Sequence, residues 1–437
     1  MSDQSTPDTS HDPYEAFRYK SFRRYSIGLT FVQMATAMQG LAIAWEIYVR
    51  TDNVLALGMV GLVQAIPMWL FSLPGGYLAD VFDRRRLIQI SFFLSTLTSL
   101  GLAAFSYAKA SVIAMFVLLF IDASIMRMAG GARAAILPLL VPVDAFENAV
   151  KWRFTLFQVC AVVGPALGGF IIAWHLQAAY LFCAGSTALF IAILAMIHVE
   201  EGTRSAPGNP LGQLVEGLRF VRNQSVILGA ISLDLFAVLL GGAVYLLPVF
   251  ARDIIHLERW GLQPEAALGW LRAAPGAGAL VMALLMTHTP PMRKAGRGMF
   301  LAVAGFGIAT IIFGLSRNFW LSMAMLFFAG FFDTISVVIR HTLVQVRTPN
   351  EMRGRVSAVN SMFIGSSNEL GGFESGLVAK IFNPVISVVS GGIGTLLIVA
   401  LWMKCFPALR KLESLSEEGP DEIIGTRTEQ APDPKDN

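Results

Sequence analysis

The chain has 437 residues, of which 55% are hydrophobic and 14% charged, and its mean hydropathy is +0.60. Soluble domains carry about 25% charged residues, so this composition excludes that class and indicates a polytopic membrane protein. The net charge of +3 is small and spread over the loops, so it does not favour nucleic acid as a partner. The three cysteines lie in or beside apolar runs without metal-ligand spacing, and they indicate neither a zinc site nor a disulfide framework.

Apolar segments long enough to cross a bilayer, about 20 residues each, follow one another along the chain. The first half contains about Tyr25–Tyr48, Leu55–Ala79, Leu87–Tyr107, Ser111–Leu140, Phe154–Trp174 and Ala178–Val199. The second half contains about Val226–Phe250, Gly269–His288, Met299–Leu315, Phe319–Ile339, Val356–Ala379 and Asn383–Phe406. We therefore expect an all-α polytopic membrane protein of about twelve transmembrane helices.

Polar stretches divide the chain into five parts. We expect a cytoplasmic N-terminal tail (1–22), a first six-helix bundle (23–199), a cytoplasmic linker (200–224), a second six-helix bundle (225–407) and a disordered cytoplasmic tail (408–437). The first 22 residues lack a short apolar stretch with a cleavage site, so no cleaved signal peptide is expected.

The linker and the loops predict how the chain sits in the membrane. Leu211, Leu214, Leu218 and Val221 recur at helical spacing beside arginines, which predicts an amphipathic helix on the cytoplasmic surface. Most of the 33 lysines and arginines fall in the two termini and in alternate loops. Because cytoplasmic loops retain such residues, both termini are predicted to be cytoplasmic.

The loop between the second and third segments has a distinctive order of residues. It reads Gly-Tyr-Leu-Ala-Asp-Val-Phe-Asp-Arg-Arg-Arg from Gly76 to Arg86. Arginines alone would only anchor the loop at anionic headgroups. The whole order, however, resembles the loop 2–3 signature of the major facilitator superfamily, Gly-x-Leu-Ala-Asp-Arg-x-Gly-Arg-Arg/Lys, and departs from it at Val81 and Asp83. The resemblance implies a conformational latch, whose residues are Gly76, Asp80, Arg84 and Arg85.

A second pattern lies in the fifth segment, where Gly164, Pro165, Gly168 and Gly169 form Gly-Pro-Ala-Leu-Gly-Gly. Such small residues often mean only a close-packed, Pro-kinked helix pair. The order also resembles the fifth-helix motif of drug–proton antiporters, although Cys160 stands where that motif has a further glycine. The resemblance favours export over uptake.

A third pattern and a repeat extend the resemblance over nearly the whole chain. The stretch Thr348 to Val356, Thr-Pro-Asn-Glu-Met-Arg-Gly-Arg-Val, is similar to a loop of enterobactin-exporter-like and macrolide-efflux-like carriers. At an offset of 207, Arg133, Pro142, Asp144, Gly164 and Gly169 recur as Arg340, Pro349, Glu351, Gly371 and Gly376. Such a repeat predicts the two parallel six-helix halves of a major facilitator fold.

Ionisable residues inside the apolar segments are the candidate site residues. A charge at the bilayer centre costs about 2.5 to 3.5 kcal/mol on insertion scales, so each needs a structural partner or a transport role, and both remain open. Asp234 has no cation three or four positions away and is the first candidate for proton coupling. Glu46 and Arg272, near the outer ends of their segments, are expected to guard the mouth or snorkel. The candidates for proton coupling or substrate binding are Asp234, Asp122, Asp333, Glu369, Glu374 and Arg127.

No nucleotide-binding loop of the Gly-x-x-x-x-Gly-Lys-Ser/Thr type occurs, which argues against ATP hydrolysis. We therefore expect a secondary active transporter, not an enzyme, which exports a drug-like compound or siderophore by alternating access in exchange for protons. Its expected partners are the substrate, protons and the lipid bilayer of the bacterial inner membrane, with no cofactor and no metal, and a monomer is expected. Two alternatives remain: an uptake carrier of the same fold, and a non-transporting membrane receptor or assembly partner.

Overall fold

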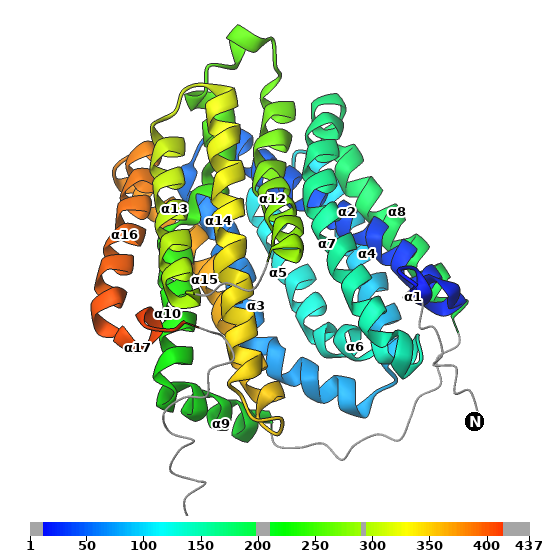
Figure 1. Cartoon of the computed structure of the whole chain (residues 1–437). Helices are drawn as coiled ribbons and strands as arrows, with labels where there is room; N and C mark the ends of the chain where they lie inside the picture. Colours follow the sequence, from blue (N-terminus) through cyan, green and yellow to red (C-terminus); the bar gives the residue numbers. More distant parts are fainter. Residues whose placement is uncertain (1–11, 198–209, 290–293, 414–437) are drawn as a thin grey trace, which may run out of the picture.

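The computed structural model describes residues 12–197, 210–289 and 294–413, and regular structure within them is helical (Figure 1). The first half comprises α1 (Glu15–Arg18), α2 (Lys20–Thr51), α3 (Val54–Val81), α4 (Arg84–Tyr107), α5 (Val112–Met128), α6 (Gly130–Ala135), η1 (Leu137–Leu139), α7 (Val143–Trp174) and α8 (Leu176–Ala195). After α9 (Pro210–Asn223), the second half comprises α10 (Ser225–Leu240), η2 (Gly242–Leu246), α11 (Leu247–Val249), η3 (Phe250–Ile254), η4 (Leu257–Trp260), α12 (Pro264–His288), α13 (Ala295–Leu315), α14 (Phe319–Val346), α15 (Arg353–Ile381), α16 (Pro384–Cys405) and α17 (Pro407–Arg410).

Short polar residues start several of the long helices. The Asn53 side chain accepts a hydrogen bond from the Leu55 amide, and Asp83 accepts one from the Arg86 amide at 2.7 Å. Asn318 and Asn383 cap α14 and α16 in the same way. Such caps satisfy amides that have no partner within the helix, so each helix begins at a defined point of its loop.

The predicted membrane helices are present. Among the described residues, 10 helices are long and apolar enough to cross a membrane, or 11 if the bent pair formed by Val112–Met128 and Gly130–Leu139 is one span. The 29-residue α15 is a further long helix, but it carries more polar residues and falls short of that hydropathy. The expectation of an all-α polytopic membrane protein is confirmed.

Three segments differ from the predicted boundaries because hydropathy does not follow backbone geometry. The segment predicted as Val226–Phe250 is not one continuous helix: α10 ends at Leu240, and η2, α11 and η3 continue the span to Ile254. The segment predicted as Ser111–Leu140 bends by 43° after Met128. Helix α7 begins at Val143, well before the predicted Phe154, because its first turns are polar.

The helices form two bundles that lie side by side, α2 to α8 on one side and α10 to α16 on the other (Figure 1). They contact each other mainly along α3 with α15 and along α7 with α12. The repeated glycines occupy equivalent places in the two bundles. Gly164 packs on α2 and Gly371 on α10, whereas Gly169 and Gly376 each pack on a helix of the opposite bundle.

The segments between and beyond the bundles pack against them. In α9, the Glu216 carboxylate lies 2.7 Å from the Arg355 guanidinium of α15, and Val221 is buried, whereas Leu211 and Leu218 are exposed. At the other end of the chain, the Gly296 amide donates to the Leu412 carbonyl at 3.1 Å. The predicted disordered tail therefore does not begin at residue 408, and its remainder, 414–437, lies outside the described residues, as do the first residues of the predicted linker.

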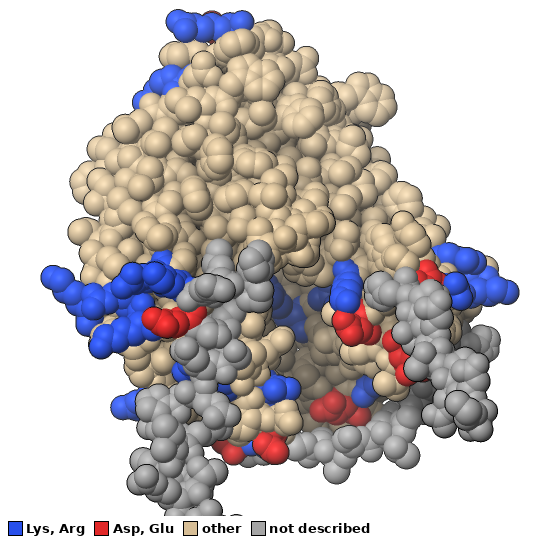
Figure 2. All heavy atoms as spheres, viewed as in Figure 1, with Lys and Arg blue, Asp and Glu red and all other residues tan. Residues whose placement is uncertain are grey.

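Charged side chains gather mainly at the end of the molecule where α9 and α6 lie, and an uncharged band separates them from a smaller basic group at the opposite end (Figure 2). At the charge-rich end, the surface is hollowed between the two bundles (Figure 2).

Candidate functional site

Glycines bring the two bundles together along α3 and α15. A Cβ atom on Gly376 would lie 2.6 Å from the Gly58 Cα, and one on Gly61 would lie 2.5 Å from the Glu369 carbonyl oxygen. Only residues without side chains allow backbones to approach this closely. The Trp69 indole also donates to the Ser366 hydroxyl at 2.9 Å across the same contact.

The Gly164–Gly169 motif lies at the equivalent contact of α7. A Cβ atom on Gly169 would lie 2.8 Å from the Gly269 Cα of α12, in the second bundle. Gly164 and Gly168 face α2 within the first bundle, where the nearest atoms belong to Met34, Ala37 and Met38. The motif therefore joins α7 both to its own bundle and to the opposite one.

An acid and two arginines lie where the bundles meet. The Tyr245 hydroxyl of η2 donates to the Glu369 carboxylate of α15 at 3.2 Å. Arg272 of α12 and Arg127 of α5 are both close enough to interact electrostatically with this carboxylate, and Arg127 belongs to the first bundle. Glu369 thus interacts with a cation of each bundle.

Arg272 does not snorkel to the helix end. Its side chain is solvent-exposed although the residue lies about two turns into α12, because it lines a cavity inside the second bundle. Glu46, for which a place at the mouth was also predicted, is only 3% exposed and pairs with Arg50 at 3.1 Å. It also accepts a hydrogen bond from the Tyr180 hydroxyl at 2.7 Å.

The cavity has a volume of about 200 Å³, and η2 and helices α12, α13 and α14 contribute most of its walls. Its polar lining includes Tyr245, Arg272, Thr310, Asp333 and Asn368. Of the predicted candidates, Asp333 lies in this cavity, and Glu369 lies beside it through its hydrogen bond to Tyr245.

Asp234 is not isolated. Its carboxylate forms an ion pair with the Arg340 guanidinium of α14, and the two side chains are 5% and 2% exposed. Its own helix has no cation three or four positions away, as the sequence indicates, and the structure supplies the partner from another helix.

The remaining acids accept hydrogen bonds from hydroxyl groups. Asp122 accepts hydrogen bonds from Ser95 and Thr98 of α4, each at 2.7 Å, and it forms no ion pair among the described residues. Glu374 is half-buried and accepts a hydrogen bond from the Ser375 hydroxyl at 3.4 Å.

The predicted latch residues lie at the charge-rich end. Asp80 is exposed and has no hydrogen bond or ion pair with any residue that the structure describes. Arg85 donates to the Ala195 carbonyl at 2.5 Å, within the first bundle. Near Gly76, the preceding Gly75 packs on the backbone of Arg127 and Met128. The loop is therefore attached to its own bundle in this conformation.

At the opposite end, polar contacts join the bundles. The Tyr48 hydroxyl donates to the Asp253 carboxylate, and the Arg252 guanidinium lies 3.0 Å from the Asp52 carboxylate. The same guanidinium lies 5.2 Å from the centre of the Tyr48 ring. The bundles are thus joined at this end, which we call the closed end, and separated by a hollow at the other.

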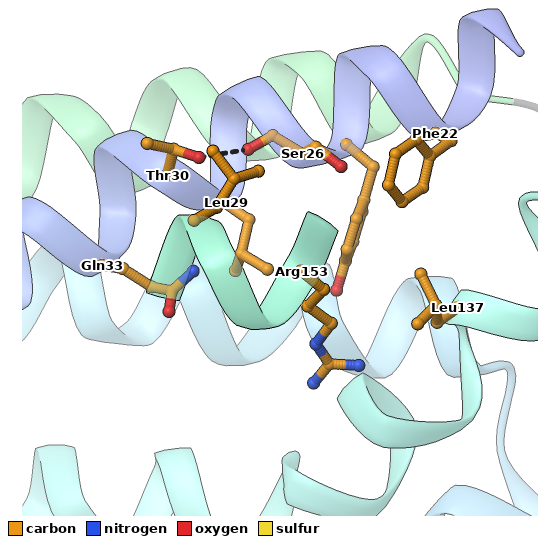
Figure 3. A pocket seen from close by; sticks show the side chains of 9 residues that line it. Phe22, Ser26, Leu29, Thr30, Gln33, Leu137 and Arg153 are labelled. Atoms are coloured by element: carbon orange, nitrogen blue, oxygen red, sulfur yellow. Dashed lines mark hydrogen bonds between the residues drawn. The ribbon is translucent and has the colours of Figure 1, made fainter. Parts of the chain in front are cut away.

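A smaller crevice between α2, η1 and α7 includes Ser26, Gln33 and Arg153 in its lining (Figure 3). Its volume of about 10 Å³ is barely enough for one water molecule, so it is not a substrate site. Among the described residues, no group of three or more His, Cys, Asp or Glu side chains is placed to hold a metal ion.

Two helical bundles around a charged junction define a polytopic membrane transporter. A sequence profile of the family described as transmembrane secretion effector matches residues 11–430, and the chain belongs to this family of the major facilitator superfamily. The enterobactin exporter EntS of Shigella boydii serotype 18 is 22% identical over 399 residues, which cover 90% of this chain and 93% of that protein. The Escherichia coli protein of the same name has the same identity and coverage.

Solved structures agree on the fold. A D-xylose–proton symporter is similar with a TM-score of 0.67 and 15% identity, covering 91% of this chain and 99% of that one. A bacterial homologue of the human lysosomal transporter Spinster, in an inward-facing and unoccupied conformation, has a TM-score of 0.66 and 14% identity, covering 92% and 99%.

Sequence reasoning missed Tyr245 and misplaced Arg272. The signal for Tyr245 was the pair Gly241-Gly242, which interrupts an otherwise apolar span and here ends α10. Interrupted membrane helices often line binding sites, because the freed backbone groups need polar surroundings.

Proposed function

We propose that the protein is a secondary active exporter of a small organic molecule, works by alternating access and exchanges its substrate for protons. Export is supported by the curated relatives, which are named enterobactin exporters. A siderophore of that kind is therefore the first substrate to test. The antiporter-type motif of α7 supports the same direction.

The position of Glu369 carries the proposal of proton coupling. The carboxylate interacts electrostatically with Arg127 of the first bundle and with Arg272 of the second, so its charge attracts both bundles. Protonation would remove that attraction and change the relative stability of the two conformations, which is what coupling requires. Glu369 replaces Asp234 as our first candidate, because Asp234 already has a buried partner.

The hollow end is the cytoplasmic end in this proposal. Lysines and arginines gather there, as expected of cytoplasmic loops (Figure 2). The contacts of Arg252 with Asp52 and of Tyr48 with Asp253 then close the outer end. Substrate would enter the hollow from the cytoplasm and leave after these contacts open.

Flux into proteoliposomes tests the proposal. Inside-out vesicles that are acidified inside should accumulate enterobactin, and dissipating the proton gradient should stop accumulation. Glu369→Gln should reduce gradient-driven accumulation to background while sparing binding, because the substitution removes the titratable group. Glu258→Gln, an exposed glutamate in η4, is the matched control and should behave like wild type.

The outcomes separate the alternatives. Proton-driven movement in the opposite direction would make the protein an uptake carrier. No flux in either direction from folded protein that binds the substrate would favour a receptor. If the amide variants of Asp122, Asp234, Asp333, Glu369 and Glu374 all still accumulate substrate, coupling uses another group or ion.

A further inference from the structure

The cavity of the second bundle has the size and walls of a ligand site. Its volume is about 200 Å³, and its lining includes Phe306, Phe313 and Met325. An apolar cavity of about 150 Å³ is known to hold benzene, so this one has room for a single ring with a substituent. All the lining residues belong to the second bundle.

Arg272 supplies a positive charge to this cavity. Its side chain is exposed there, yet it forms no ion pair and no side-chain hydrogen bond with any described residue. Glu369 attracts it from a distance but is itself hydrogen-bonded to Tyr245 and faces Arg127 as well. A guanidinium within a membrane-spanning helix is costly without a close anion, and it pairs well with a carboxylate through two parallel hydrogen bonds.

Asp333 lies towards the other end of the cavity. Helices α12 and α14 run in the same direction (Figure 1), and they touch where a Cβ atom on Gly330 would overlap the Pro275 carbonyl and one on Gly278 would overlap the Phe327 carbonyl. Arg272 lies on the N-terminal side of these contacts in α12 and Asp333 on their C-terminal side in α14, so the two residues lie at different levels along the helix axes. The cavity is therefore positive at one end and negative at the other.

We propose that this cavity binds an aromatic acid, a single ring carrying a carboxylate or similar anion that pairs with Arg272. The ring lies against Phe306 and Phe313, and the anionic group points away from Asp333. This inference rests on the proposed function, because it names the chemical class of the transported molecule or of one of its parts.

Binding of three probes to the purified full chain in detergent tests the inference without any gradient. Benzoate, benzamide and benzylamine have the same ring and differ in charge. Calorimetric titration up to about 10 mM detects ligands of millimolar affinity. We expect benzoate to bind, and benzamide and benzylamine to bind at least about tenfold more weakly.

Four variants locate the site. Arg272→Gln should weaken benzoate binding about tenfold or more. Arg272→Lys should weaken it less, because lysine keeps the positive charge but lacks the planar guanidinium that forms two parallel hydrogen bonds with a carboxylate. Ala309→Phe places a large side chain from α13 in the cavity, leaves every charged residue in place and should abolish benzoate binding. Arg297→Gln removes an exposed cation of α13 that does not line the cavity, and this variant should bind benzoate like wild type. Thermal unfolding of each variant without ligand confirms that it is folded.

Asp333→Asn provides a test of opposite sign. It removes the negative charge from the cavity and should strengthen benzoate binding. If Asp333→Asn instead weakens benzoate binding as much as Arg272→Gln does, the inference is overturned. It is also overturned if folded wild type does not bind benzoate, or binds benzoate and benzamide equally. Unchanged benzoate binding by folded Arg272→Gln would overturn it as well. If benzoate fails to bind while enterobactin is exported, the inference falls and the proposed function stands.

Discussion

A carboxylate inside an apolar helix must be paired, hydrogen-bonded or protonated, and the acids of this chain differ in which condition they meet. Asp234 has a full charge partner in Arg340, and both are buried. Asp122 accepts hydrogen bonds from two hydroxyls and has Arg133 of its own bundle at longer range. Glu369 has one hydroxyl donor and two cations at longer range. Of these three acids, Glu369 is the one that interacts with both bundles, so its protonation would weaken an attraction that involves both.

For the Asp234–Arg340 pair we predict a structural role. Replacing Asp234 alone by Leu leaves Arg340 buried without a partner, which typically destabilises a protein by about 3–5 kcal/mol. Replacing both residues by Leu should recover most of that loss, since apolar pairs often substitute for buried ion pairs. Unfolding in detergent and proton-driven flux should be measured on both variants.

The flux of the double variant decides between structure and coupling. A stable double variant with normal proton-driven accumulation supports the structural role. A stable double variant that binds substrate but no longer accumulates it would contradict the prediction and indicate that Asp234 takes part in proton coupling.

Which acids are paired could not be read from the sequence. The partner of Asp234 comes from α14, and only the tertiary packing of α10 against that helix brings them together. Arg272 was misplaced because its predicted segment began at Gly269, whereas α12 begins at Pro264. That shift of more than one turn moves the residue from the helix end into the cavity wall.

At the level of helices, the pseudo-symmetric contacts are built on glycine. Gly169 packs on Gly269 and Gly376 on Gly58, so each repeat supplies a glycine to the other bundle. A helix surface without side chains permits close approach, and its flatness also permits small shifts of one helix along the other. These contacts therefore suit a junction about which two bundles move.

We predict that Gly169→Leu stops transport. The new side chain would meet the Glu265 carbonyl at 2.7 Å and the Gly269 backbone at 2.8 Å, neither of which can rotate away. Such overpacking typically lowers the free energy of unfolding by about 1–3 kcal/mol, and here it would force the two bundles apart. Flux, membrane yield and thermal stability should be compared with those of Gly185→Leu, the same change in α8 where no atom lies within 4 Å of the added Cβ.

The two variants separate packing from transport. A low membrane yield of Gly169→Leu alone would mean that the contact serves folding. Normal export by a well-inserted Gly169→Leu variant would remove the motif as support for an antiporter and leave the direction of transport to be decided by flux alone.

The helices themselves could be predicted because apolar runs of membrane length have few alternatives to helix in a bilayer. The points at which these helices are interrupted could not be predicted in this way. Gly241-Gly242 and the bend after Met128 lie in runs that remain apolar, so hydropathy is unchanged where the backbone turns. The first turns of α7 are polar, and hydropathy therefore placed its start at Phe154 instead of Val143.

For the whole molecule, the two ends differ in what joins the bundles. One end is hollowed between them (Figure 2), and the other is held by the contacts of Tyr48 with Asp253 and of Arg252 with Asp52. The repeat and the number of apolar segments predicted two equivalent bundles. They could not predict which end is closed, because a symmetric sequence pattern is compatible with either conformation.

We predict that Arg252→Gln shifts the protein towards opening at the closed end. An exposed ion pair stabilises the conformation in which it forms by about 0.2–1 kcal/mol. Its loss should therefore change the ratio of the conformations closed and open at this end by up to about fivefold. Distances between spin labels on cysteines placed at the exposed Tyr107 and Glu258 would report the shift, after the exposed Cys405 is replaced by serine. Arg259→Gln removes an exposed cation of η4 and serves as control. An unchanged distance distribution in Arg252→Gln would show that this pair does not stabilise the closed end.

Asp80 lies at the hollow end, in the loop that resembles the family signature. The carboxylate is exposed and has no partner among the described residues, so in this conformation it stabilises nothing that the structure shows. If the loop is a latch, as its motif implies, Asp80 engages the second bundle only when the hollow closes. Asp80→Asn should then slow transport and shift the protein further towards the open hollow, while substrate binding from that side and thermal stability stay unchanged.

Asp83→Asn is the matched control for this prediction, because it removes the same charge from the same loop. Asp83 accepts a hydrogen bond from the Arg86 amide at the start of α4, and asparagine caps helices about as well as aspartate. The control should therefore transport like wild type. Labels on the two bundles at the hollow end would report the conformational shift beside the flux measurement. A correctly inserted Asp80→Asn variant with unchanged transport kinetics would show that this loop, despite its resemblance to the family signature, does not act as a latch in this protein.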